Sequence, residues 1–261
     1  MSETVSLKLE NGIGEIILNR PEAFNAFNLE IVEALAQRLM PLAHNQEIRA
    51  LVISGAGRAF CAGGDLKWAA SFPAGPPAAF HTLAGRFHQS IMEIRRLPLP
   101  VIAAVNGVAA GAGFSLALAC DFRVMAQSAV LRQAYTSAGL CIDGGGTHSL
   151  PRLVGLAKAL EIAAFDRPIS AEQALAWGLA TKVVPDGQAL ESAWNMAREL
   201  AGLSLDSFRW AKRLLIDSFQ TPLEVQLENE RLGLTICAGR PDGREGMKAF
   251  TEKRKPKFPA S

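Results

Sequence analysis

The order of apolar and polar residues predicts a β-hairpin followed by a helix at the start of the chain. Apolar residues alternate with polar ones over 6–10 and 13–19, and Asn11 and Gly12 between them are typical of a two-residue hairpin turn. Asn28 is a residue type that caps helices, and apolar residues recur at helical spacing after it. These residues are Ile31, Leu35 and Leu39.

Short apolar strands and helical patterns then alternate through the first two thirds of the chain. The predicted strands are 50–54, 101–105, 122–126 and 183–184, and the predicted helices are 79–96 and 112–119. The Pro-, Gly- and Ala-rich stretch Ser71–Pro77 predicts a mobile loop. From about Leu156 the pattern is mostly helical. This alternation predicts crossover units in a layered α/β fold.

The last third differs, because its helical patterns have little strand to pack on. The four predicted helices are 189–203, 206–219, 223–238 and 242–254. They are expected to cover the core or another subunit. The chain has no repeat of fixed period and no linker long enough to separate two domains.

One apolar segment has two interpretations. Val101–Cys120 carries no charge, and Gly107 and Gly111 have the GxxxG spacing found in membrane helices. Against this, Pro100 precedes the segment, Asn106 and Gly107 form a turn signal within it, and many of its residues are Ala or Gly. A buried strand, a glycine turn and a buried helix are the favoured prediction.

Composition and charge exclude several classes of function. The chain has 49% apolar and 20% charged residues, as expected of a folded globular protein. A formal charge of +2 argues against nucleic acid or an anionic membrane as the main partner. The four cysteines include no CxxC pair and no zinc-type spacing, and Met1–Glu10 has no secretory pattern. We therefore expect reduced thiols, no metal and a cytoplasmic protein.

Common catalytic motifs are missing, and two glycine-rich turns remain as candidates. The chain has no GxGxxG after a strand, no GxxxxGK[ST], no HExxH and no GxSxG. The turns at 62–65 and 106–113 each lead toward a helix, where free backbone N–H groups can bind an oxyanion. The alternative is that these glycines only permit close packing and positive φ.

Five motifs in order give the chain a resemblance to the enoyl-CoA hydratase/isomerase (crotonase) superfamily, including its 1,2-epoxyphenylacetyl-CoA isomerase-like members. The motifs are Leu18–Pro21, Arg58–Leu66, Pro100–Gly113, Gly145–Gly155 and Glu245–Pro256. The resemblance implies an α/β spiral of ββα units over 1–200 and a helical region over 201–261 that covers CoA and forms a homotrimer or a dimer of trimers. It also implies an acyl-CoA substrate, with no cofactor because CoA is part of that substrate.

The resemblance further implies an oxyanion hole and the loss of two carboxylates. The N–H groups of Gly64 and Ala112 would hold the thioester oxygen. The two glutamates of the hydratases would fall at Ser115 and Tyr135, neither of which is an acid. We interpret Ser115 as a small helix residue facing the pocket and Tyr135 as a packing wall with a polar tip. An ordinary hydratase mechanism therefore lacks its bases.

Asp143 is the remaining candidate acid or base. From the residues alone, it is as consistent with an Asx turn or a helix N-cap as with catalysis. It is similar in position to the catalytic aspartate of some crotonase isomerases and to the nucleophilic aspartate of the 4-chlorobenzoyl-CoA dehalogenases. In a nucleophilic route His88 would activate water, although a lone histidine on a helix face is more often a packing residue.

The resemblance implies further substrate contacts. Near the oxyanion hole these are Ala62, Asp65 and Leu66, with the acyl group selected by Leu66–Arg86. For CoA they are Arg20, together with Phe250 on the adenine and Lys253 on the 3′-phosphate, both from a neighbouring subunit. The basic run around Lys253 is otherwise typical of a solvated tail.

We expect an acyl-CoA isomerase in which Asp143 carries the proton. The alternatives are a hydratase with an unusual base, an aryl-CoA dehalogenase or thioesterase, and a CoA-binding protein without catalysis.

Overall fold

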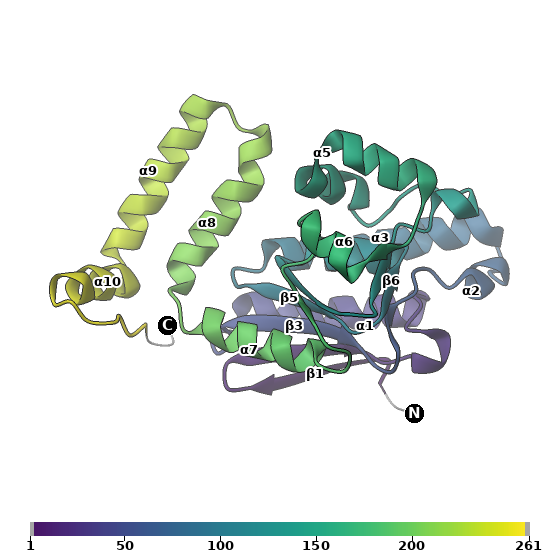
Figure 1. The fold of residues 1–261 in the computed structure, drawn as a ribbon, viewed down its shortest axis with the longest axis horizontal. Helices are drawn as coiled ribbons and strands as arrows, with labels where there is room; N and C mark the ends of the chain where they lie inside the picture. Colours follow the sequence, from purple (N-terminus) through teal and green to yellow (C-terminus); the bar gives the residue numbers. More distant parts are fainter. Residues whose placement is uncertain (1–2, 259–261) are drawn as a thin grey trace.

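The computed structural model describes residues 3–258 and contains a six-stranded sheet (Figure 1). Its strands in spatial order are β1 (Val5–Glu10), β2 (Ile13–Leu18), β3 (Ala50–Gly55), β5 (Val101–Val105), β7 (Phe122–Ala126) and β10 (Lys182–Val184). β1 and β2 are antiparallel, and the other neighbours are parallel. Asn11 and Gly12 both have positive φ, 50° and 77°, as a tight hairpin turn requires. The predicted hairpin is confirmed.

A second sheet of four short strands was missed by the sequence analysis. It contains β4 (Ala59–Cys61), β6 (Val108–Ala110), β8 (Val130–Arg132) and β9 (Ile169–Ser170). Strands of two or three residues are too short to show a hydrophobic period. Three times, a strand of the large sheet is followed by a strand of the small sheet and then by helix. This repeated ββα order confirms the predicted fold class.

Helices lie around the two sheets and against one another. They are α1 (Leu29–Leu39), α2 (Leu66–Ala70), α3 (Gly75–Arg96), α4 (Ala112–Ala119), α5 (Gly146–Phe165), α6 (Ala171–Ala176) and α7 (Ala189–Ala201). Asn28 caps α1 by accepting a 3.1 Å hydrogen bond from the Ile31 amide, as predicted. β3 and β5 are buried along their whole length, and α7 contacts both of them. α7 therefore covers the core, which is one of the two positions expected for the C-terminal helices.

Two helix starts lie earlier than predicted. Gly75–Pro77 form the first turn of α3, so the last three of the seven residues of the expected mobile loop are helical, and 71–74 lie between α2 and α3. Proline fits the first helical turn because its missing N–H would have no partner there. α5 begins at Gly146, ten residues before Leu156, because its first half contains Pro151 and kinks at Gly155, which interrupt the helical pattern.

Val101–Cys120 is a buried strand, turn, strand and helix, which resolves its two interpretations. β5 and β6 precede α4, all eight residues of which are buried. Within residues 3–258, no helix has the length and apolar character needed to cross a bilayer.

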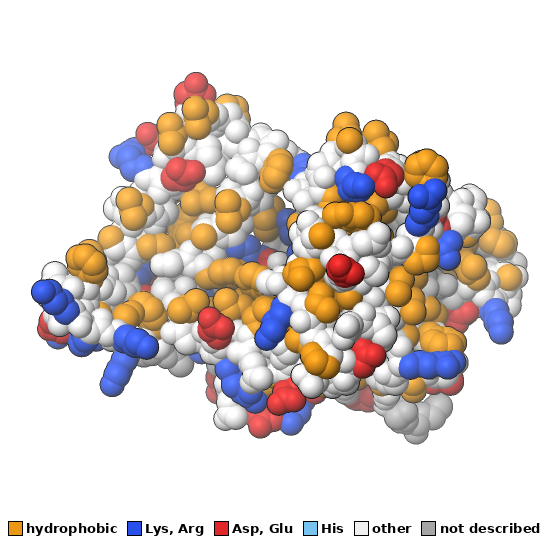
Figure 2. Space-filling model, viewed as in Figure 1, with side chains coloured by type: hydrophobic (Ala, Val, Ile, Leu, Met, Phe, Trp, Pro, Cys, Tyr) orange, Lys and Arg blue, Asp and Glu red, His pale blue; other side chains and the backbone are white. Residues whose placement is uncertain are grey.

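Three C-terminal helices extend away from the body (Figure 1). They are α8 (Leu205–Asp217), α9 (Leu223–Gly239) and α10 (Pro241–Thr251). Apolar side chains are exposed along them, as Figure 2 shows over α8 and α9. Those on α9 are Leu223, Val225, Leu227, Leu232 and Leu234. The division into 1–200 and 201–261 remains a prediction, and 259–261 lie outside the described residues.

Candidate active site

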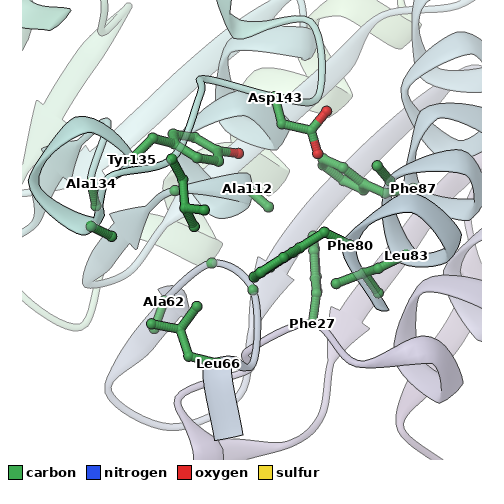
Figure 3. A pocket seen from close by; sticks show the side chains of 16 residues that line it. Phe27, Ala62, Leu66, Phe80, Leu83, Phe87, Ala112, Ala134, Tyr135 and Asp143 are labelled. Carbon is green, nitrogen blue, oxygen red and sulfur yellow. The ribbon is translucent and has the colours of Figure 1, made fainter. Parts of the chain in front are cut away.

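A cavity of about 100 Å³ lies where the turn after β4, the start of α4, helix α3 and the segment before α5 meet (Figure 3). Its walls are mostly apolar. The lining residues are Phe27, Ala62, Gly63, Gly64, Leu66, Phe80, Leu83, Ala84, Phe87, Gly111, Ala112, Ala134, Tyr135, Ala138, Leu140 and Asp143. Among these, only Tyr135 and Asp143 have polar side chains, so they supply the side-chain chemistry of the cavity.

The two predicted glycine turns meet at this cavity. Gly63 has a φ of 101°, and a Cβ there would lie 2.9 Å from the Ala110 carbonyl oxygen and 3.4 Å from the Ala112 nitrogen. Glycine is therefore required for the close approach. The amides of Gly64 and Ala112 donate no hydrogen bond to any residue in the described part of the chain. Both N–H groups are available to a substrate oxygen, as an oxyanion hole requires.

Arg20 and Asp65 do not line the cavity. The Arg20 guanidinium donates to the Ala26 carbonyl oxygen at 2.6 Å and pairs with Asp65 at 3.3 Å. Asp65 also caps α2 by accepting a 3.0 Å hydrogen bond from the Trp68 amide. Both side chains are mostly buried. They hold the turn that contains Gly64, a positioning function that the sequence analysis did not anticipate.

Asp143 faces the cavity with one oxygen held and the other free. Its Oδ1 accepts a 2.5 Å hydrogen bond from the Gly144 amide and lies 2.5 Å from Nε2 of His88. Its Oδ2 accepts no hydrogen bond from any residue among 3–258. α5 begins at Gly146 after a Gly145 cap, so the N-cap interpretation of Asp143 is wrong.

Ser115 supports the Asp143 loop instead of facing the pocket. It is 1% exposed, and its hydroxyl donates to the Asp143 carbonyl oxygen at 2.5 Å. The expectation that its side chain faces the pocket is corrected by this contact, which draws the hydroxyl toward the loop backbone. The Ser115 side chain thus holds the main chain that carries Asp143.

Tyr135 forms the predicted wall with a polar tip. The residue is 9% exposed, and Figure 3 shows its hydroxyl pointing toward Asp143. Burial raises the pKa of Tyr135, and the nearby charge of Asp143 raises it further. The hydroxyl is therefore protonated at neutral pH and can donate a hydrogen bond.

His88 contacts Asp143 from outside the cavity wall. The two residues are 55 positions apart in sequence, and the His88 side chain is 51% exposed on α3. The ring therefore touches the candidate acid, and its expected function of activating water stays a prediction. Only the packing of α3 against the Asp143 loop brings the pair together.

Phe250 and Lys253 lie far from this cavity in a single chain. Phe250 is 84% exposed on α10, which Figure 1 places at the opposite end of the molecule from α2. Ala62 and Leu66, by contrast, line the cavity as predicted. One copy of the chain therefore does not bring Phe250 to the cavity, and its expected contact with CoA stays a prediction.

The two buried thiols do not compete with Asp143. Burial raises the pKa of both Cys61 and Cys120 to about 12, which keeps these thiols uncharged and poorly nucleophilic. No group of three or more potential metal ligands occurs in the chain between residues 3 and 258. Two free amides opposite one carboxylate can stabilise an enolate and move a proton at carbon.

Comparisons with known proteins agree with this geometry. The family described as enoyl-CoA hydratase/isomerase matches residues 8–261. The chain is similar to 1,2-epoxyphenylacetyl-CoA isomerase of Escherichia coli, with 39% identity over 259 residues and 99% of each chain covered.

Solved structures give the same result. An enoyl-CoA hydratase from Polaromonas sp. JS666 matches with a TM-score of 0.93 and 38% identity, covering 98% of this chain and 99% of that one. An enoyl-CoA hydratase from Bacillus anthracis matches with a TM-score of 0.92 and 34% identity, covering 99% of this chain and 100% of that one. The relatives carry both isomerase and hydratase names, so their names do not choose between the two reactions.

Proposed function

Because this chain belongs to the enoyl-CoA hydratase/isomerase (crotonase) family and acts on CoA thioesters, we propose that it is an acyl-CoA isomerase that uses Asp143 as its acid and base. The observation that carries the proposal is that Asp143 is the only carboxylate lining the described cavity and has one unbonded oxygen. Serine and tyrosine stand at 115 and 135, so the two bases of a hydratase are absent.

The reaction follows from this arrangement. Oδ2 of Asp143 takes a proton from the carbon next to the thioester, and the electron pair moves onto the thioester oxygen. Gly64 and Ala112 stabilise that oxyanion with their N–H groups. The carboxylic acid then returns the proton to a different carbon, which moves a double bond or completes the opening of a ring. The apolar walls keep water away from the enolate.

The remaining parts of the site belong to CoA. We expect CoA to enter only as part of the substrate, without another cofactor. Its adenine and 3′-phosphate would contact Phe250 and Lys253 of a second copy of the chain, in a homotrimer or a dimer of trimers. The exposure of Phe250 and the apolar residues on α9 support this assembly.

Proton exchange tests the proposal. In D₂O, the parent protein should exchange α-protons of butyryl-CoA, and Asp143→Asn should bind this thioester but exchange about 10² to 10⁴ times more slowly. Asparagine keeps the shape of the side chain while removing the base. Unchanged exchange in the folded variant would refute the proposal, as would rapid hydration of crotonyl-CoA by the parent.

A second candidate function draws support from the contact between His88 and Asp143. In a hydrolytic dehalogenation, Asp143 attacks the ring carbon that carries the halogen, and halide leaves. Water deprotonated by His88 then cleaves the aryl ester and regenerates Asp143. Incubation with 4-chlorobenzoyl-CoA separates the functions by mass, because dehalogenation exchanges chlorine for hydroxyl. A CoA-binding protein without catalysis would be stabilised by both thioesters and convert neither.

A further inference from the structure

The segment that carries Tyr135 is held in an unusual backbone conformation. Ala134 has a φ of 53°, a left-handed value that is rare for a residue with a side chain. Its amide donates to Oδ1 of Asp166 at 2.8 Å, and the Tyr135 amide donates to Oε1 of Gln133 at 3.0 Å. Gln133 is fully buried and Asp166 is 4% exposed. Two buried polar side chains therefore fix the direction in which Tyr135 points.

The Tyr135 hydroxyl makes no hydrogen bond of normal geometry with any residue among 3–258. Its oxygen is buried, and the Ser115 side chain and the Asp143 backbone lie close enough to lower the pKa of Tyr135, although burial and the Asp143 charge outweigh them. The proton of Ser115 is already donated to the Asp143 carbonyl oxygen. Buried polar groups in folded proteins are nearly always paired, so an orphaned hydroxyl at a cavity wall indicates a partner supplied by the ligand.

The surroundings of the hydroxyl limit what that partner can be. The facing walls include Phe27, Phe80, Leu83 and Phe87, which offer no acceptor. The thioester oxygen has its own donors in Gly64 and Ala112. Figure 3 shows the hydroxyl on the same side of the cavity as Asp143. In the proposed function, Asp143 exchanges a proton with carbons close to the thioester. The missing acceptor therefore belongs to the acyl group.

We propose that the Tyr135 hydroxyl donates a hydrogen bond to an oxygen atom at, or bonded to, the β-position of the acyl group. Tyr135 then determines specificity by favouring oxygen-bearing acyl groups, such as ethers, epoxides and hydroxyacyl chains, over hydrocarbon chains of the same shape. This inference rests on the proposed function, because the position of the oxygen is defined relative to the carbon from which Asp143 takes a proton.

The test compares two pairs of thioesters that differ in one group. Methoxyacetyl-CoA and butyryl-CoA differ by an oxygen in place of a methylene, and 3-hydroxybutyryl-CoA and 3-methylbutyryl-CoA differ by a hydroxyl in place of a methyl. Dissociation constants are measured by calorimetry for the parent and for Tyr135→Phe, which keeps the ring. For at least one pair, the preference for oxygen over carbon should fall about tenfold in the variant.

The outcomes are distinct. If Tyr135→Phe leaves the oxygen preference of both pairs unchanged, or weakens all four ligands equally, the inference is overturned. A lower unfolding temperature with unchanged preferences would assign the hydroxyl a structural function and also overturn it. The measurement needs no turnover, so it remains valid if Asp143→Asn retains proton exchange. In that case the proposed function fails separately.

Discussion

The glycine after Asp143 offers a direct test of how the candidate base is positioned. Gly144 has a φ of 61°, and a Cβ there would lie 2.3 Å from Cε1 of Phe87 and 3.0 Å from Cβ of Ser115. Phe87 is 1% exposed, and its ring contacts Phe27 at a centroid distance of 5.0 Å. Because the ring cannot move into open space, Gly144→Ala must displace the loop that carries Asp143.

The magnitude follows from two costs. A left-handed conformation costs a residue with a side chain about 1–2 kcal/mol, and overpacking a buried site costs about 1–3 kcal/mol. Gly144→Ala should therefore lower the free energy of unfolding by about 2–5 kcal/mol. A displacement of about 1 Å at a reacting group reduces rate about 10²-fold. We expect α-proton exchange to fall by at least that factor in the folded variant.

Gly139 supplies a matched control in the same loop. Its φ is 69°, and a Cβ there would meet no atom within 4 Å. Gly139→Ala should therefore lower the free energy of unfolding only by the conformational cost, about 1–2 kcal/mol. Its rate of α-proton exchange should stay that of the parent. Urea denaturation and exchange into butyryl-CoA are measured on both variants. Equal losses in the two would refute the argument that contact with Phe87 positions Asp143.

Two further predictions concern His88 and Lys253. His88→Gln keeps a hydrogen-bond donor near Oδ1 of Asp143. If the protein is an isomerase, the rate of α-proton exchange in D₂O should therefore stay within about tenfold of the parent rate. A loss as large as that of Asp143→Asn would instead make the imidazole itself essential. Lys253→Ala should weaken the binding of CoA more than the binding of dephospho-CoA in calorimetric titrations, because only CoA carries the 3′-phosphate. Equal weakening of both ligands, or a strictly monomeric protein by light scattering, would contradict a CoA site shared between two copies of the chain.

Elements with a local signal were predictable from sequence. The hairpin turn at Asn11 and Gly12 and the helix capped by Asn28 depend on residues adjacent in the chain, and both are observed. Helix α4 was predicted at its observed bounds, Ala112–Ala119, because a glycine turn precedes it. Gly64 and Tyr135 were predicted as site residues from the family resemblance, and both line the cavity.

Features that depend on distant contacts were not predictable. The four strands of the small sheet are stabilised by pairing between segments far apart in sequence, as β8 with β9, and leave no periodic pattern. The same holds for the ion pair of Arg20 with Asp65, which joins residues 45 positions apart and supports the turn that contains Gly64. The expected contact of Arg20 with CoA stays a prediction. The orphaned hydroxyl of Tyr135 is visible only when its surroundings are complete.

The position of Asp143 depends on the small side chain at position 115. Ser115 is almost fully buried, and a Cβ on Gly146 would lie 2.8 Å from its Oγ, so the loop backbone packs directly on this short side chain. A glutamate at 115 would extend into the space that the loop occupies and would displace Asp143 with it. We therefore expect Ser115→Glu to displace Asp143 from its observed position. In the proposed isomerase, the short side chain at 115 is therefore what allows Asp143 to keep its observed place at the cavity.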